Sequence, residues 1–106
     1  LIVGINGDAS VKRLKGPGRP INTLDDRVAV LRSLRAVDKV FVFDDDTPEA
    51  LICEVAPDIL VKGPEAARGP IPGSEWVTLR GGRVVVPQWN VDISTTAICE
   101  RIRWTT

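Results

Sequence analysis

Short runs of apolar, mostly β-branched residues alternate with helical segments along the whole chain, and this alternation restricts the possible fold more than any other feature. The expected strands are residues 1–6, 40–43, 59–61 and 83–86. The expected helices are residues 23–35, 47–56 and 94–103, whereas residues 74–79 show no clear periodicity. Strands that are apolar throughout are typical of a parallel sheet that helices cover on both faces. The sequence therefore predicts an α/β protein with a doubly wound parallel sheet and right-handed crossovers.

Two of the expected helices carry start signals. Thr23 is followed three positions later by Asp26, which resembles a capping box. Thr47 stands directly before Pro48, and this pair predicts an N-cap followed by proline at the first helical position.

Length and charge exclude several classes of protein. The 106 residues suffice for one domain, residues 1–106, and the 14 basic and 14 acidic side chains cancel. A nucleic-acid-binding protein would need an overall positive field, so nucleic acid is not an expected partner. No apolar run approaches the roughly 18 to 20 residues that span a bilayer, and no signal peptide is visible. We therefore expect a cytoplasmic protein without a membrane partner.

The cysteines and histidines predict no resident metal site. Cys53 and Cys99 lack the close spacing of zinc and redox motifs and lie in apolar helical patterns, so both are expected to be reduced thiols in the core. The chain contains no histidine, so the usual structural zinc sets cannot be assembled from it.

A cation-rich segment follows the first expected strand. Residues 7–20 are expected to form a loop of glycines, prolines and the four cations Lys12, Arg13, Lys15 and Arg19. Ligands of doubly wound sheets sit beyond the carboxyl ends of the strands, and glycines allow the backbone to approach a phosphate closely. The segment is interpreted as a phosphate site, with a solvated surface loop as the alternative.

Three hydroxyls stand at the start of the last expected helix. Ser94, Thr95 and Thr96 would present their side chains where free N–H groups and the positive end of the helix dipole attract an anion. The alternative is an ordinary N-cap. Because the segment follows the last strand, it too is expected at the ligand edge.

The acidic run from Asp44 to Asp46 permits two interpretations. Carboxylates suit magnesium, but acidic residues just before a helix are also favoured by local electrostatics, and we favour the second. A phosphoacceptor receiver domain is excluded because Lys62, and not an aspartate, follows the strand at residues 59–61.

Two segments together resemble the cytidylyltransferase-like nucleotidyltransferases, and most of all the adenylyltransferases of bacterial ADP-heptose synthesis. They are the KGPGRPIN run at residues 15–22 and the ISTTAI run at residues 93–98. The resemblance covers almost the whole chain and implies a Rossmann-like nucleotidyltransferase fold. It also implies transfer of a nucleotidyl group from ATP, or another nucleoside triphosphate, to a sugar phosphate, with Mg²⁺ carried on the nucleotide.

The resemblance assigns roles to single residues. By this resemblance, Lys15 is expected to be the catalytic cation, and Lys12 and Arg19 are expected to bind phosphate. Ser94, Thr95 and Thr96 would hold the triphosphate. Lys62 and Gly63 match a VKGGDY run that borders the nucleoside, although residues 64–66 read Pro-Glu-Ala and residues 88–92 also depart from the family. Arg35 lies in a run that relatives place at a subunit contact or the active edge.

One family signature is not found in the chain. The family carries an HxGH motif after its opening strand, and with no histidine here that strand, the motif and the first helix are expected to precede Leu1. The fold is thus expected to be N-terminally incomplete, and its open sheet edge is expected either to pair in a homo-oligomer or to be covered by the preceding segment. A catalytically inactive nucleotide-binding or oligomerising module is the alternative to the enzyme.

Overall fold

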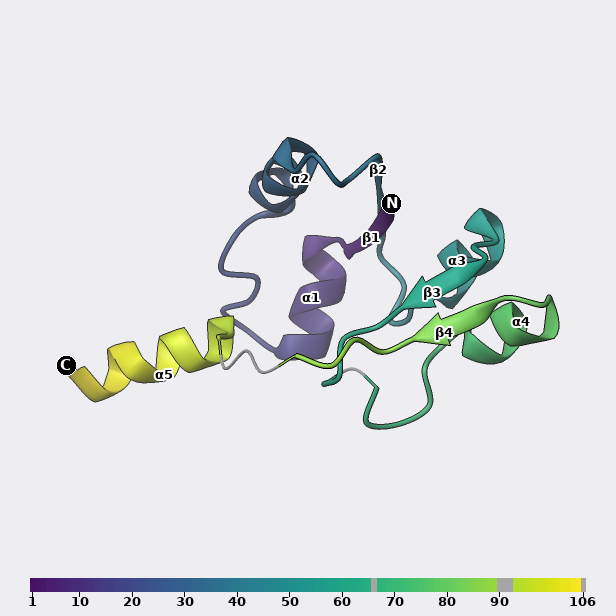
Figure 1. Ribbon diagram of the computed structural model, residues 1–106. Helices are drawn as coiled ribbons and strands as arrows, with labels where there is room; N and C mark the ends of the chain where they lie inside the picture. The colour runs from purple at the N-terminus through teal and green to yellow at the C-terminus, as the bar shows by residue number, and fades with distance from the viewer. Residues whose placement is uncertain (66, 90–92, 106) are drawn as a thin grey trace.

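The computed structural model describes residues 1–65, 67–89 and 93–105 and shows strands and helices in alternation (Figure 1). The elements in chain order are β1 (Ile2–Asn6), α1 (Asp8–Lys15), α2 (Leu24–Ser33), β2 (Lys39–Phe43), α3 (Glu49–Val55), β3 (Ile59–Val61), α4 (Ser74–Leu79), β4 (Arg83–Val85) and α5 (Thr95–Thr105). None of the described helices is both long enough and apolar enough to cross a bilayer. All four predicted strands are present.

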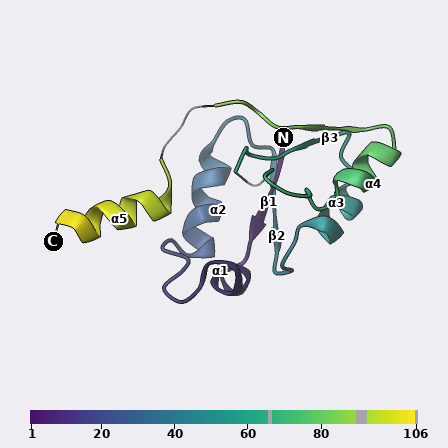
Figure 2. The same cartoon turned by 90° about the horizontal axis from the view of Figure 1, so that it is seen from below.

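The strands pair in parallel, which confirms the predicted α/β class. β1 pairs with β2 in the register Ile2↔Lys39 to Asn6↔Phe43, and β3 pairs with β4 in the register Ile59↔Arg83 to Val61↔Val85. Among the described residues these are two separate two-stranded ladders and not one continuous sheet (Figures 1 and 2). A hollow of about 570 Å³ lies against β1, α3 and β3, between the two ladders.

The capping predictions have different outcomes. Thr23 is the N-cap of α2, and its Oγ1 accepts a hydrogen bond from the backbone N–H of Asp26 at 3.4 Å, as predicted. The prediction that Thr47 caps α3 is wrong. Pro48 occupies the cap position, with φ −81° and ψ 10°, and its carbonyl accepts the N–H of Ile52 at 2.9 Å. Pro48 is therefore the residue directly before the helix, and its carbonyl accepts the first helical hydrogen bond.

The prediction of a loop over residues 7–20 is wrong in its first half. Residues 8–15 form α1, with Asp8 in the first turn and Lys12, Arg13 and Lys15 in the last. This charge order complements the helix dipole. The helix ends at Gly16, whose φ of +93° favours glycine. The cations thus stabilise a helix end, and the irregular segment begins only at Gly16.

The core is small and centres on α3 and α4. Ile52 and Val77 are its buried apolar side chains, and Val77 is fully enclosed. A Cβ atom at Gly82 would come within 2.6 Å of the Asp58 carbonyl oxygen, so only glycine lets the turn before β4 pass this close. Cys53 and Cys99 are free thiols, as predicted, but both are only half-buried and do not belong to the core.

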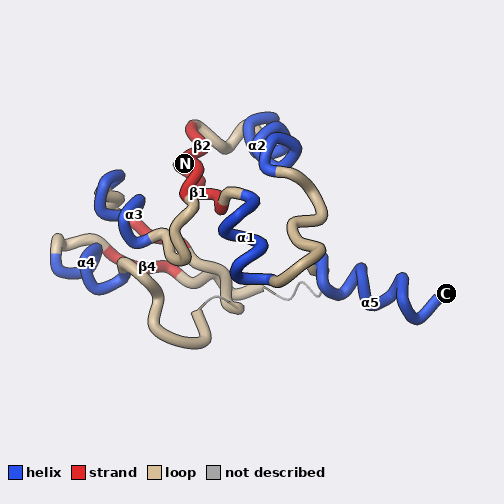
Figure 3. The backbone as a smooth tube through the Cα atoms, turned by 180° about the vertical axis from the view of Figure 1, so that it is seen from behind, coloured by secondary structure: helices blue, strands red, loops and turns tan. Residues whose placement is uncertain are grey.

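The last helix extends away from the rest of the molecule (Figures 1 and 3). α5 begins at Thr95, one residue later than predicted. Residues 90–92 and Ala66 lie outside the described residues. The structure therefore describes only part of the segments 64–66 and 88–92, whose sequences differ from the motifs that the chain otherwise resembles.

Candidate functional site

A hydrogen-bonded cluster closes the carboxyl end of β1. The Asn6 side chain donates from Nδ2 to Ser10 Oγ at 2.9 Å, and the Ser10 hydroxyl donates to the carbonyl of Asp45 at 3.1 Å. Ser10 is fully buried, although it is a polar residue on a short helix. The cluster therefore fixes α1 against the turn that follows β2.

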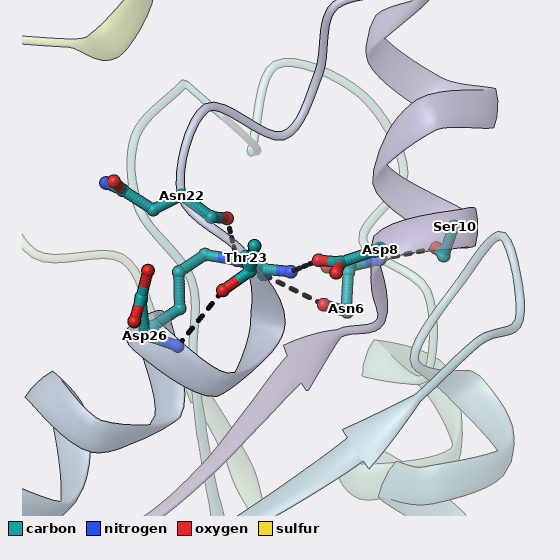
Figure 4. A network of polar contacts seen from close by, with 7 residues as sticks. Asn6, Asp8, Ser10, Asn22, Thr23 and Asp26 are labelled. Atoms are coloured by element: carbon teal, nitrogen blue, oxygen red, sulfur yellow. Dashed lines mark hydrogen bonds and ion pairs between the residues drawn. The ribbon is translucent and has the colours of Figure 1, made fainter.

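Arg27 makes a second set of hydrogen bonds at the carboxyl end of β1. Its guanidinium donates from Nη1 to the Asn6 carbonyl at 2.8 Å, from Nη2 to Asp8 Oδ1 at 2.7 Å and from Nε to the Asn22 carbonyl at 3.0 Å. Figure 4 shows Asn6, Asp8 and Asn22 converging from β1, α1 and the segment before α2. One side chain thus ties three parts of the chain together.

Arg27 was not among the functional residues predicted from the sequence. A signal was present, because Arg27 lies in the first turn of α2, where the helix dipole disfavours a cation. A cation in that position requires acceptors nearby, and here two backbone carbonyls and one carboxylate supply them.

The segment between α1 and α2 brings two predicted phosphate ligands together. Gly16 and Gly18 have positive φ angles of 93° and 85° and turn the chain back from the end of α1. Arg19, in the same segment, donates from Nη2 to Thr96 Oγ1 at 3.0 Å. The cation-rich segment and the hydroxyl cluster, predicted separately, therefore meet.

The three hydroxyls at the start of α5 have different surroundings. Ser94 Oγ accepts the N–H of Ala97 at 3.0 Å, and the Ser94 carbonyl accepts that of Ile98 at 3.0 Å. Ser94 is therefore an N-cap, as the alternative interpretation expected. Thr95 and Thr96 are exposed, and Thr96 contacts Arg19. Binding of a phosphate by these three residues stays a prediction.

The remaining cations of the segment separate into two groups. Arg13 donates from Nε to Asp46 Oδ1 at 3.0 Å and from Nη2 to the Asp44 carbonyl. Lys12 and Lys15 are exposed in the last turn of α1. Arg13 is therefore occupied by the turn after β2, while Lys12 and Lys15 stay candidates for phosphate binding.

The acidic residues after β2 contact α1 and the residue that precedes it. Asp46 pairs with Arg13, and the carboxylate of Asp44 lies so close to Gly7 that a Cβ atom there would come within 1.9 Å of its Oδ1. Within the described ranges, no three His, Cys, Asp or Glu side chains gather in a way that could hold a metal ion. Asp46 therefore holds α1 against the turn after β2, and both interpretations of the acidic run stay predictions.

Among the described residues, no hydrogen bond or ion pair joins Arg19 to the other predicted residues, which are Lys62, Gly63 and Arg35. Lys62 follows β3, and its N–H donates to the Val85 carbonyl at 3.1 Å. Gly63 comes next, against the ring of Trp89. Arg35 is exposed before the amino end of β2, so its chain position is at the edge opposite Asn6.

The amino edge of the strands carries an ion pair between the chain's first residue and Asp38. The ammonium of Leu1 donates to Asp38 Oδ2 and, by this hydrogen bond and its charge, lowers the pKa of the Asp38 carboxyl. Asp38 directly precedes β2, so this pair lies at the far end of the strands from Arg27.

Known proteins match this chain over nearly its whole length. The family model described as cytidylyltransferase-like matches residues 1–101. The Bifunctional protein HldE of Alcanivorax borkumensis is 53% identical over 103 residues, and that of Pseudomonas fluorescens is 52% identical over the same length. The Bifunctional protein HldE of Ectopseudomonas mendocina is 54% identical over 103 residues. Each comparison covers 97% of this chain, and the chain spans 22% of the relatives' length.

Proposed function

Because the chain belongs to the cytidylyltransferase-like family, we propose that it transfers an adenylyl group from ATP to a sugar phosphate, as in bacterial ADP-heptose synthesis, and releases pyrophosphate. The observation that carries the proposal is the contact between Arg19 and Thr96. It joins the two segments that resemble the family's phosphate-binding motifs. A guanidinium beside the N-terminal end of a helix is a favourable place for a polyphosphate.

The proposed reaction is an in-line displacement at phosphorus. A phosphate oxygen of the sugar phosphate forms a bond to the α-phosphorus of ATP, and the bond from that phosphorus to the bridging oxygen of the β-phosphate breaks. The electron pair leaves with pyrophosphate. The protein's part is to position the two phosphates and to stabilise the charge that develops on the leaving group.

The cations and the hydroxyls would have different roles in this reaction. Lys15, with Lys12 one turn earlier on α1, would stabilise charge near the α-phosphorus, and Arg19 would hold the β- and γ-phosphates. Thr95 and Thr96 would orient the same groups from the start of α5. Mg²⁺ would arrive as part of the nucleotide substrate, and cytoplasmic ATP fits a cytoplasmic setting.

The arrangement of Arg19 favours this function. Its guanidinium is anchored at one nitrogen to a neutral hydroxyl and has no carboxylate partner among the described residues, whereas Arg13 and Arg27 are each paired with one. A phosphate could therefore approach Arg19 without displacing a carboxylate. By this difference, Arg19 is suited to bind a ligand, whereas Arg13 and Arg27 stabilise the fold.

The test is pyrophosphate release by the protein at its full natural length. We expect release that requires both ATP and a sugar phosphate, and that falls when Arg19 is replaced by Ala. Replacement of exposed Arg32, on α2, serves as the control with the same change of charge. Equal rates for the Arg19→Ala variant and the parent would contradict the assignment of the site.

The catalytically inactive nucleotide-binding module stays the alternative to the enzyme, and the full-length protein distinguishes the two. ATP binding without pyrophosphate release by the full-length protein would favour the module.

We also propose that the protein forms a homo-oligomer. Exposed apolar side chains surround the hollow between the ladders, among them Leu1, Ile2, Ile59 and Val61. Apolar patches of this kind mark association surfaces. A monodisperse monomer in sedimentation of the full-length protein would contradict this proposal.

A further inference from the structure

The location of the Arg19 guanidinium depends on how the segment between α1 and α2 is held at its two ends. At the α1 end, Gly16 and Gly18 have positive φ angles of 93° and 85°, and glycine restricts the backbone less than any other residue. Directly after Arg19, the ring of Pro20 fixes its own φ angle. Arg19 therefore follows the α2 end of the segment more closely than the α1 end, and whatever fixes Asn22 also positions Arg19.

The α2 end is held by Arg27 through a backbone atom. Nε of Arg27 donates to the Asn22 carbonyl at 3.0 Å, and Nη1 of the same side chain donates to the Asn6 carbonyl at 2.8 Å (Figure 4). A guanidinium is planar and presents its N–H groups in a fixed fork, so its acceptors take set positions relative to one another. The Asn22 carbonyl is thereby held at a fixed place relative to the end of β1.

The end of β1 is itself firmly anchored. Asn6 is paired with Phe43 in the β1–β2 ladder, and the N–H of Gly7 donates to the Phe43 carbonyl at 2.9 Å. The Asn6 side chain also donates to buried Ser10. The contacts of Arg27 therefore connect the segment that carries Arg19 to the sheet.

The surroundings of Arg27 strengthen this connection. Its side chain is only 21% exposed, and Nη2 donates to Asp8 Oδ1 at 2.7 Å. Partial burial reduces the screening that weakens fully exposed ion pairs. Each of the three guanidinium nitrogens of Arg27 thus has an acceptor within the protein.

We propose that Arg27 is a positioning residue for phosphate binding: it holds the Asn22 carbonyl against the end of β1 and so keeps Arg19 where it contacts Thr96 and the phosphates of ATP. This inference rests on the proposed function and adds to it a residue that acts through Arg19 without touching the ligand. A cation that is held in place before the ligand arrives loses less conformational freedom on binding.

A double-mutant cycle tests whether Arg27 acts through Arg19. Titration calorimetry with ATP compares the full-length parent, Arg27→Ala, Arg19→Ala and the variant with both changes, and circular dichroism checks that each is folded. We expect Arg27→Ala to weaken ATP binding by about fivefold or more when Arg19 is present. Once Arg19 is already Ala, the same change should weaken binding by less than about twofold.

Two control variants separate the backbone contacts from charge. Arg32→Ala removes an exposed cation from the same helix. Asp8→Asn removes the ion pair of Arg27 but leaves both of its carbonyl acceptors in place. Neither change should weaken ATP binding. Weakening by Arg32→Ala as large as that by Arg27→Ala would show that the charge of α2 is responsible and would overturn the proposal.

Arg27→Lys keeps the charge but loses the planar fork. A lysine has a single nitrogen on a flexible stem and cannot hold the three acceptors in the geometry that a guanidinium imposes. We therefore expect Arg27→Lys to weaken ATP binding nearly as much as Arg27→Ala, and it replaces that variant in the cycle if Arg27→Ala does not fold. Parental ATP affinity in Arg27→Lys would overturn the proposal.

The remaining outcomes separate this inference from the proposed function. Equal weakening by Arg27→Ala with and without Arg19 would indicate either direct contact with ATP or a merely structural role, and would overturn the positioning role. Unchanged ATP affinity in folded Arg27→Ala, with weakened binding in Arg19→Ala, would overturn this inference and leave the proposed function intact. A parent protein that does not bind ATP would overturn both.

Discussion

Arg19 donates a hydrogen bond of 3.0 Å from Nη2 to Oγ1 of Thr96, a residue 77 positions later in the sequence. The contact joins the turn after α1 to the first turn of α5. Neither residue is needed by the core, since the buried apolar side chains belong to α3 and α4. A long-range polar contact outside the core is more informative about binding than about folding.

Replacement of Arg19 by Ala should weaken ATP binding by about 1.5 to 3 kcal/mol, because a charge-assisted donor to phosphate is lost. Thr95→Ala should cost less, about 1 kcal/mol, since a neutral hydroxyl is removed while the helix amides remain. Titration calorimetry with ATP ranks the variants. The reverse order would mean that the helix start, and not the cation, dominates the site.

Replacement of Arg27 by Ala should lower the free energy of unfolding by about 2 to 4 kcal/mol, because its three acceptors lose a charged donor. Thermal or urea unfolding of the full-length protein measures the loss. Arg32→Ala removes an exposed cation from the same helix and should change stability by no more than about 0.5 kcal/mol. Similar small effects of both variants would show that the Arg27 contacts are weak in solution.

Gly82→Ala should destabilise the protein by about 1 to 3 kcal/mol or more through overpacking. The added Cβ would approach the Asp58 carbonyl to 2.6 Å and Val77 Cγ1 to 2.8 Å. Gly69→Ala, with nothing within 4 Å, is the control and should be neutral. Unfolding midpoints that match for the two variants would disprove the close approach at Gly82.

The 106 residues by themselves should release no pyrophosphate from ATP and a sugar phosphate. The expectation follows from the family resemblance, which places catalytic histidines in a motif that this sequence does not contain. Contacts that stabilise a developing oxyanion are typically worth about 3 to 4 kcal/mol each. Turnover well above background by the purified chain would refute this expectation.

The local parts of the fold could be predicted from the sequence. All four strands and the Thr23 cap follow from patterns a few residues long. Helix α1 was missed because its cations lie next to the glycines and prolines that begin at Gly16, and together they resemble a loop. The order of charges, with Asp8 first and Lys12, Arg13 and Lys15 last, was the signal that distinguishes this helix from a loop.

The nonlocal parts could be predicted only in outline. The carboxyl edge of parallel strands was expected to gather Arg19 and Thr96, and the structure brings them into contact. The partners of Arg27 are mostly backbone carbonyls, which every residue carries, so no residue type reveals them. Division into two ladders depends on strand pairing between distant segments, for which sequence patterns give no register.

The separation of the ladders also bears on how the native protein opens. Backbone amides in β1 and β2 bond within one ladder, and those in β3 and β4 within the other, with no ladder hydrogen bond shared among the described residues. Cooperative units of this kind can unfold locally without breaking each other. The amides of β3 and β4 can therefore exchange with deuterium at a rate independent of those in β1 and β2, so that the two ladders fluctuate separately.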